Sequence, residues 1–209
     1  MRIFIDPGHG GKNTGVHVGT LIEKNYTLQL AIDLREALGS LYKDVELSRH
    51  DDDYVMLRDR FVSASNFGAD LAVSIHVNAA HHRGLKGLMA FANNAEAANF
   101  GTEIMRSAPP SLRRKQPKTF ITSPDDWTKR AHNCLEGYEC AAVLVECFFA
   151  SNANDLVFGQ SRAGRRAIVS SIASGIANYD SDLWTRGFGR LDGSMLCDSE
   201  LEHGGSIRG

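Results

Sequence analysis

Short apolar runs alternate with longer helical patterns along most of this 209-residue chain, and this alternation restricts the folds open to it. The runs typical of strands are residues 2–5, 45–48, 71–77, 87–92 and 141–149. Apolar side chains have helical spacing in 23–38, 54–67, 95–107 and 162–178. Such alternation is typical of a layered α/β domain. Because the strands are continuous apolar runs, we expect a mostly parallel twisted sheet with helices on both faces.

The length predicts one domain, residues 1–180, followed by a loosely ordered tail, residues 181–209. Domains commonly contain about 100–200 residues. The tail is rich in glycine and has neither helical nor strand periodicity. Inside the domain, residues 109–139 follow a helix that stops before two prolines, and we expect them to form a long loop with one helix.

Charge and hydropathy exclude several classes of partner. The chain has 23 Lys and Arg and 25 Asp and Glu, so its net charge of −2 offers no general attraction to nucleic acid or an anionic membrane. No run of 18 apolar residues exists, so we expect no insertion into a membrane. The first residues, MRIFIDPGHGG, are typical of a buried strand entering a turn and not of a signal peptide. The oligomeric state is left open.

Four polar side chains stand where strands end or a helix begins. They are His9 after the first strand, Glu23 at the start of the first helix, and His76 and Glu146 at the ends of two later strands. In an open parallel sheet, ligands bind beyond the carboxyl ends of the strands. If these strands are parallel, the four side chains converge on that edge of the sheet.

Two imidazoles and a carboxylate form a suitable set of ligands for zinc. A catalytic zinc site has three protein ligands, here His9, Glu23 and His76, and keeps one position for water. The net charge of such a site lowers the pKa of the bound water toward about 7. Glu146 is then left to accept the proton of this water and return it to a leaving amine. The pattern predicts zinc-assisted hydrolysis of an amide at the carboxyl-end edge of the sheet.

Each of these residues also has a purely structural interpretation. His76 alone could be a hydrogen-bonded core histidine, and Glu23 alone a surface charge favoured by the helix dipole. Cys147 is a conceivable nucleophile, but successive strand residues face opposite sides, so a core position is favoured for it. The loop after His76 offers two alternative ligands, His81 and His82. The motifs H-E-x-x-H and G-x-S-x-G are absent, which argues against two common classes of hydrolase.

At these residues the chain resembles the zinc-dependent N-acetylmuramoyl-L-alanine amidases of the amidase-3 type. The matching segments run in order through residues 1–180. They are IDPGHGG at 5–11, Glu23-Lys24, LSR at 47–49, LRDRFVSASN at 57–66, LAVSIHVNA at 71–79, GLKGLMAF at 84–91 and VLVECFFASNAND at 143–155. The family commonly has a small residue and then Gly-Phe after its catalytic glutamate. Cys147-Phe148-Phe149 departs from this pattern and is more similar to the bacteriophage endolysin branch.

The resemblance implies a catalytic domain at residues 1–180 with one zinc ion per chain, held by His9, Glu23 and His76, and with Glu146 as the catalytic glutamate. The implied substrate is bacterial peptidoglycan, cut at the amide between N-acetylmuramic acid and L-alanine of the stem peptide. Two cellular settings are compatible with it. One is an endolysin that stays in the host cytoplasm until it is released to the cell wall. The other is an extracytoplasmic domain of an exported autolysin.

Further residues are predicted to assist. Asp6 and Asn78 flank the proposed ligands and are expected to orient them, with a role in the turn as the alternative. The basic cluster Arg113, Arg114 and Lys115 is expected to contact anionic groups of the wall substrate, with a solvated loop as the alternative.

Three rival hypotheses are of different classes. Another zinc-dependent peptidoglycan hydrolase, a peptidase or a deacetylase, could use the same site. A wall-binding module without catalysis would lack a ligand or Glu146, and none is missing. A nucleic-acid binder using the basic cluster is disfavoured by the net charge and by the lack of aromatic residues interleaved with it.

Overall fold

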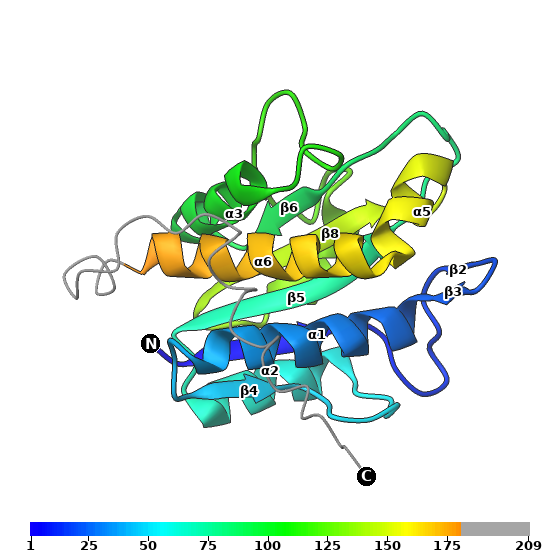
Figure 1. Cartoon of the computed structure of the whole chain (residues 1–209). Helices are drawn as coiled ribbons and strands as arrows, with labels where there is room; N and C mark the ends of the chain where they lie inside the picture. The colour runs from blue at the N-terminus through cyan, green and yellow to red at the C-terminus, as the bar shows by residue number, and fades with distance from the viewer. Residues whose placement is uncertain (181–209) are drawn as a thin grey trace, which may run out of the picture.

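The structure is a computed structural model that describes residues 1–180, and a six-stranded sheet forms its centre (Figure 1). Across the sheet the strands are β4 (Val45–Leu47), β1 (Ile3–Pro7), β5 (Leu71–Asn78), β8 (Ala141–Phe149), β6 (Met89–Ala92) and β7 (Phe120–Ile121). The first four run parallel, whereas β6 is antiparallel to β8 and β7 is parallel to β6. The predicted mostly parallel α/β sheet is confirmed. The predicted tail, residues 181–209, lies outside the described residues.

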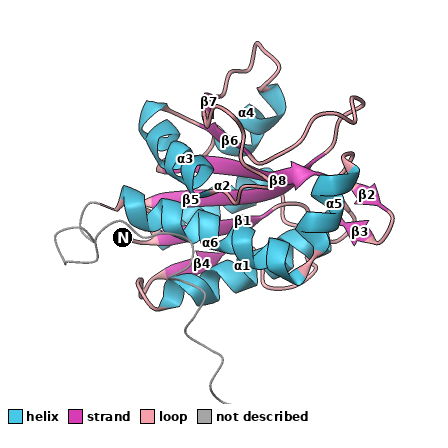
Figure 2. Ribbon diagram, turned by 45° about the horizontal axis from the view of Figure 1, so that its top comes forward, coloured by secondary structure: helices cyan, strands magenta, loops and turns pink. Residues whose placement is uncertain are grey.

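Helices cover both faces of the sheet. On one face lie α1 (Glu23–Gly39), α3 (Ala95–Ser107) and α6 (Arg162–Tyr179), side by side in front of the sheet in Figures 1 and 2. On the opposite face pack α2 (Leu57–Phe67) and α4 (Lys129–Leu135). The short α5 (Ala153–Gln160) connects β8 to α6. None of the helices within residues 1–180 has the length and apolar character needed to cross a membrane.

The predicted helical periods account for the larger of two apolar clusters. In α1 the fully buried side chains are four residues apart, at Leu30, Leu34 and Leu38. In α6 the same spacing buries Ile168, Ile172 and Ile176. Each such side chain contributes about 1.5–3 kcal/mol when it leaves water, so these two stripes fix both helices on the sheet.

Alternation along β8 determines which of its side chains can reach the site. Val145 and Cys147 are fully buried in the larger cluster under α1 and α6. Leu144 belongs to the cluster on the other face. Glu146 therefore shares the face of Leu144, and the expected core position of Cys147 is confirmed.

Four short elements were not expected from the sequence. They are the hairpin of β2 (His17–Val18) and β3 (Leu21–Ile22), strand β7 and helix α5. The strands of two residues contain no full period of alternation, and the eight residues of α5 span only about two helical turns. The boundaries of two longer elements also differ, since the helix predicted from residue 54 begins at Leu57 and the strand predicted from residue 87 begins at Met89.

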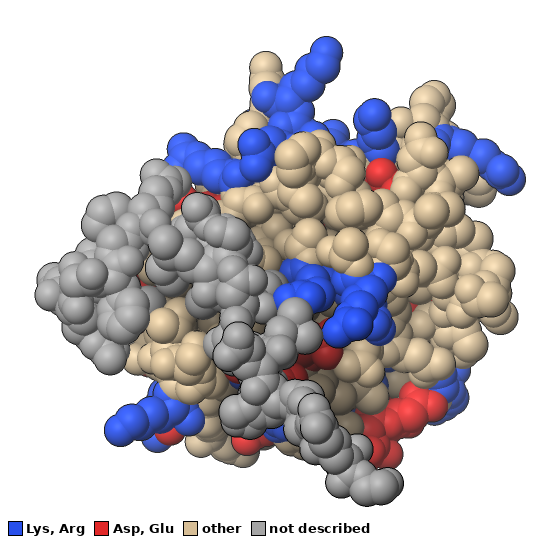
Figure 3. Space-filling model, viewed as in Figure 1, with Lys and Arg blue, Asp and Glu red and all other residues tan. Residues whose placement is uncertain are grey.

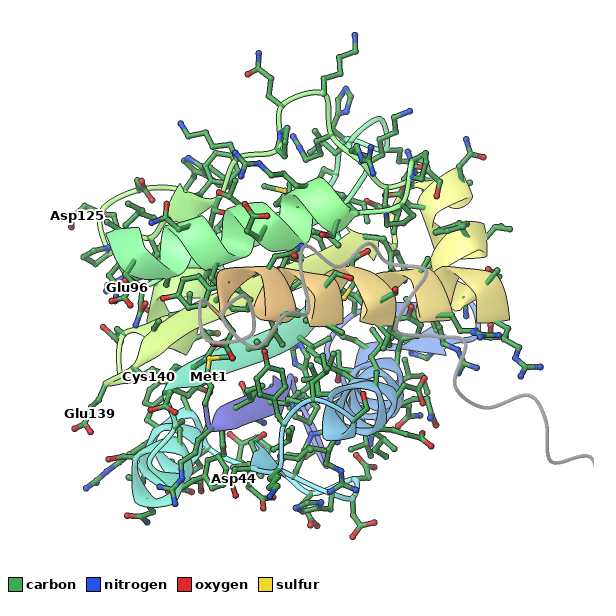
Figure 4. All side chains as sticks on the ribbon, turned by 60° about the vertical axis from the view of Figure 1, so that its left-hand side comes forward. Met1, Asp44, Glu96, Asp125, Glu139 and Cys140 are labelled. Carbon is green, nitrogen blue, oxygen red and sulfur yellow. The ribbon has the colours of Figure 1, made fainter. Side chains whose placement is uncertain are left out.

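The candidate functional residues lie toward one edge of the sheet, where the parallel strands end. Figure 4 shows Met1, Glu96, Glu139 and Cys140 along one side of the molecule, near the starts of β1, α3 and β8. The parallel strands run from this side toward the opposite edge. Near that edge lie His9 in the loop after β1, His76 in β5 and Glu146 in β8.

Candidate metal centre

Three of the predicted side chains, His9, Glu23 and His76, meet at the carboxyl-end edge of the sheet. Each offers one ligand atom, and the three atoms lie within 4.8 Å of one another. Glu23 Oε1 is 3.1 Å from His9 Nε2 and 3.2 Å from His76 Nδ1. The two imidazole rings are 4.9 Å apart between centroids and cross at 76°. The structure thus brings together the residues that parallel topology predicts to converge.

The loop after β1 holds His9 in an unusual backbone conformation. Its φ angle is 64°, and among residues 1–180 it is the only non-glycine residue with a positive φ. Such a conformation costs about 1–3 kcal/mol and persists where the surrounding structure enforces it. Gly8 lets the chain pass close to the site, because a Cβ there would lie 2.4 Å from the ring of His76. The strained backbone and the missing Cβ together place the ring of His9 next to Glu23.

Glu23 is the first residue of α1 and is almost completely buried, with 2% of its surface exposed. Its Oε1 accepts a hydrogen bond of 2.8 Å from the Val77 amide, and its Oε2 accepts one of 2.7 Å from the Val16 amide. Burial alone would raise the pKa of the Glu23 carboxyl, but the hydrogen bonds to His76 and His9 outweigh it and hold the pKa well below its usual value. Glu23 is therefore ionised at neutral pH.

His76, in strand β5, contacts the same Glu23 carboxylate. Burial would lower the pKa of its imidazole, but the hydrogen bond to Glu23 and the charge of Glu146 outweigh burial and raise the pKa. Two imidazoles thus share one ionised carboxylate in a partly buried position.

This donor set fits a zinc ion. Zinc binds imidazole nitrogen and carboxylate oxygen at about 2.0–2.2 Å in tetrahedral geometry, which places two ligand atoms roughly 3.3 Å apart. The separations of 3.1 and 3.2 Å around Glu23 Oε1 agree with that requirement. His9, Glu23 and His76 could therefore hold zinc.

Glu146 lies beside this cluster. In the sheet register it is paired with His76 of β5 on one side and with Met89 of β6 on the other. Its Oε2 is buried and has no hydrogen-bond partner among residues 1–180. Burial raises the pKa of the Glu146 carboxyl to about 7, with His76 opposing the shift and Glu23 adding to it. A buried carboxylate oxygen without a partner is unfavourable for stability and is typical of a functional group.

The four side chains line one cavity of about 880 Å³. Its floor is the sheet face that carries Glu146 and Leu144 of β8 and Phe91 of β6. Residues of α4 and of the segment before it form another part of the wall, among them Trp127 and Arg130. A cavity of this size accommodates a ligand larger than one amino acid.

The supporting residues predicted from the sequence lie at different distances from the cluster. Asn78, at the end of β5, lines the cavity, and its carbonyl accepts a hydrogen bond of 2.8 Å from the Ala150 amide. Asp6 is buried and bonds to Ser48, Ser74 and Arg60, so its link to His9 runs through Arg60. Burial would raise the pKa of Asp6, but Arg60 and the two serines outweigh it and lower the pKa.

The predicted basic cluster is divided between the cavity and the surface. Arg114 lines the cavity, whereas Arg113 and Lys115 are exposed. Arg113 donates a hydrogen bond of 3.0 Å from Nε to the carbonyl of Ala108. Figure 3 shows Lys and Arg side chains projecting along the upper edge of the molecule, where Figure 1 places the segment that leaves α3.

Three residues that support the centre were not identified as candidates from the sequence. Asn13 Oδ1 accepts a hydrogen bond of 2.9 Å from His9 Nδ1, which leaves His9 Nε2 directed at Glu23. Arg49 and Arg60 are buried and donate to backbone carbonyls at the end of β1 and in the loop after it, at distances from 2.7 to 3.1 Å. Both arginines lie in segments that carry the family resemblance, and this resemblance is the sequence feature that could have identified them.

Two histidines and two carboxylates at the carboxyl-end edge of a mostly parallel α/β sheet form an arrangement that is compatible with a metal-dependent hydrolase. The chain belongs to the N-acetylmuramoyl-L-alanine amidase family, whose model matches residues 3–178.

Individual relatives agree with this assignment. The N-acetylmuramoyl-L-alanine amidase CwlM of Bacillus licheniformis is 34% identical over 181 residues, which are 85% of this chain and 66% of the relative. The sporulation-specific N-acetylmuramoyl-L-alanine amidase of Bacillus subtilis (strain 168) is 51% identical over 80 residues, 37% of this chain and 31% of the relative. The chain therefore spans about one third to two thirds of the length of these relatives.

A solved structure shows the same fold. It is the catalytic domain of CwlV, an N-acetylmuramoyl-L-alanine amidase from Bacillus (Paenibacillus) polymyxa var. colistinus. The two structures superpose with a TM-score of 0.74 at 25% sequence identity, over 86% of this chain and 98% of that chain.

Proposed function

We propose that this chain is a zinc-dependent peptidoglycan amidase that hydrolyses the amide between N-acetylmuramic acid and L-alanine of the stem peptide. Membership of the amidase family supports this assignment of the bond that is cut. The cluster of His9, Glu23 and His76 supports the metal. The observation that carries the proposal is Glu146, whose unpartnered buried oxygen lies in the cavity shared with that cluster.

The residues have separate roles in the proposed reaction. His9, Glu23 and His76 would hold the zinc ion, which when bound acts as a Lewis acid toward the amide carbonyl and a water molecule. Glu146 accepts a proton from the attacking water and gives it to the leaving nitrogen of L-alanine. The carbonyl carbon gains the hydroxyl group as the carbon–nitrogen bond breaks, so the products are a lactyl carboxylate and a free amine.

The cellular setting remains the prediction made from the sequence. The enzyme would act on the cell wall either as a released endolysin or as a domain of an exported autolysin.

End-group analysis of digested peptidoglycan tests the proposal. Purified walls are incubated with zinc-loaded protein, and new amino groups, reducing sugars and acetate are measured. We expect new amino groups on L-alanine without new reducing ends or acetate, and we expect a zinc chelator to stop their release.

Other products would contradict the proposed bond. New amino groups on another stem residue would indicate a peptidase, and released acetate would indicate a deacetylase. Glu146→Gln protein is the control for contaminating hydrolases, because it should release almost none of these products.

A further inference from the structure

Three aromatic side chains, Phe91, Phe120 and Trp127, form a cluster at the β6–β7 edge of the cavity, and we call them the aromatic platform. The ring of Trp127 lies 4.9 Å from that of Phe120 and 5.7 Å from that of Phe91, with interplanar angles of 77° and 69°. Phe91 and Phe120 are 5.8 Å apart. Edge-to-face contacts of this kind are favourable and fix the position of the indole.

Trp127, the only tryptophan within residues 1–180, has 64% of its surface exposed. A large aromatic ring left in water at a cavity wall is typical of a binding surface. The neighbouring backbone is held by hydrogen bonds. The Thr128 amide donates to Asp126 Oδ1 at 2.7 Å, and Thr128 Oγ1 accepts from the Ser123 amide at 2.9 Å. The exposed indole is therefore presented from a hydrogen-bonded turn.

The aromatic platform is continuous with the candidate active site. Glu146 of β8 is paired with Met89 of β6, and Phe91 of β6 is paired with Phe120 of β7. Alternate residues of a strand face the same side, so these side chains share one face, and all of them line the cavity. Two strand spacings, about 10 Å, separate β8 from β7. A substrate with its scissile bond at Glu146 can therefore extend over the platform.

We infer that the aromatic platform binds a pyranose ring of the glycan strand, with the indole of Trp127 as the stacking surface. This inference rests on the proposed amidase function. The C–H bonds on one face of a pyranose carry partial positive charge, which is complementary to the negative face of an aromatic ring. The hydroxyl groups at the rim of the sugar stay in water, and the indole N–H is a donor for a sugar oxygen. An exposed aromatic surface held in a fixed position meets both requirements.

The four charged residues next to Trp127 in the sequence balance one another. Asp125 and Asp126 precede Trp127, and Lys129 and Arg130 follow it, so the segment has no net charge to attract a carboxylate. Figure 4 shows Asp125 pointing outward at the rim of the molecule.

A sugar probe without a cleavable bond tests this inference separately from the proposed function. We would titrate the zinc-loaded full chain with a tetrasaccharide of β-1,4-linked N-acetylglucosamine, which has the glycan backbone but neither stem peptide nor scissile amide. Calorimetry gives the dissociation constant. In a Trp184→Phe background, fluorescence reports on Trp127 alone. The variants are Trp127→Ala, Trp127→Phe and, as the control, Val157→Ala, which removes another exposed apolar side chain.

We expect saturable binding that weakens about five- to tenfold in Trp127→Ala. Binding should change less than about threefold in Trp127→Phe, which keeps an aromatic face, and should not change in Val157→Ala. The melting temperature of each variant shows whether it is folded.

Three results would overturn the inference. They are no binding by the unmodified protein, equal binding by folded Trp127→Ala and the unmodified protein, and a fluorescence change with free stem peptide but not with the tetrasaccharide. Because the probe contains no amide that the enzyme would cut, none of these results depends on whether the chain is an amidase.

Discussion

Arg60 Nη2 donates a hydrogen bond of 2.7 Å to the carbonyl oxygen of His9, and so connects a buried ion pair to the most strained residue of the candidate site. The other end of the same guanidinium pairs with Asp6 and donates to the carbonyl of Pro7 at 2.9 Å. Arg60 and Asp6 are both nearly inaccessible to solvent. The planar guanidinium can bind several oxygens at once in a fixed geometry, which an ammonium group cannot. Arg60 is therefore a positioning residue for His9.

Replacing Arg60 should affect both stability and zinc binding. Arg60→Ala leaves Asp6 as an unpaired buried charge, so the free energy of unfolding should fall by about 3–5 kcal/mol. Arg60→Lys keeps the positive charge but loses the planar guanidinium that binds several oxygens at once. We therefore expect a smaller loss of stability together with weaker zinc binding. Urea unfolding and competition with a zinc chelator measure the two quantities. Arg58→Ala, which removes an exposed arginine of the same helix, is the control. Zinc affinity in Arg60→Lys equal to that of the unmodified protein would remove the positioning role.

Asp6 should make the protein less stable in acid. Its pKa is lowered in the folded state from an ordinary value of 3.8. The stabilisation from its ionised form is fully present above that ordinary value and is lost as the pH falls through the lower, folded-state pKa. We therefore expect the difference in free energy of unfolding between the unmodified protein and Asp6→Asn to shrink as the pH falls from about 5 to 2. Urea unfolding at several pH values measures it. A difference independent of pH would show that the ionisation of Asp6 does not stabilise the fold.

Asn13 should determine how tightly the centre holds zinc. Its Oδ1 accepts from His9 Nδ1 and so fixes which ring nitrogen faces Glu23. Loss of such a partner commonly lowers metal affinity about 10–100-fold. We expect that loss in Asn13→Ala and a much smaller one in Asn13→Asp, which keeps the acceptor oxygen. Chelator competition gives both affinities, and Thr14→Ala controls for changes in the loop. Unaltered zinc affinity in Asn13→Ala would mean that Asn13 serves only the turn.

The basic cluster should contribute to activity on intact wall in two ways. Exposed charges mainly assist encounter with an anionic substrate, and salt screens them. Replacing Arg113, Arg114 and Lys115 together by glutamine should therefore lower activity on whole wall at low salt, and part of this deficit should disappear at high salt. Because Arg114 lines the cavity, Arg114→Gln alone should retain a deficit at high salt, unlike Arg113→Gln. Equal activity of the triple variant and the unmodified protein at low salt would leave the cluster without a role.

The sequence predicted which side chains lie together, because parallel topology determines where strand ends meet. His9 and His76 lie at the carboxyl ends of adjacent strands, and Glu146 lies opposite His76 in the next strand. Once the apolar runs are read as parallel strands, these side chains must converge. The period-two alternation of β8 also separates Glu146 from Cys147, as expected.

What the sequence did not predict depends on contacts between distant segments. Arg60 meets His9 across 51 positions of the chain, and no local pattern indicates that a charged residue of a helix will be buried. The aromatic platform forms because β7 pairs in parallel with β6 and so brings Phe120 next to Phe91. The direction of a four-residue strand follows from its tertiary packing and not from its own periodicity.

Zinc content and turnover of Glu146→Gln, measured on the same preparation, test the proposed division of roles most directly. His76→Ala serves as the comparison, because removal of a ligand should remove zinc and activity together. For Glu146→Gln we expect about one zinc per chain and turnover on peptidoglycan reduced about 10²–10⁴-fold, since the proton carrier is lost while the metal stays. Loss of zinc equal to that of His76→Ala, or turnover equal to that of the unmodified protein, would contradict the assignment of Glu146 as the group that moves the proton.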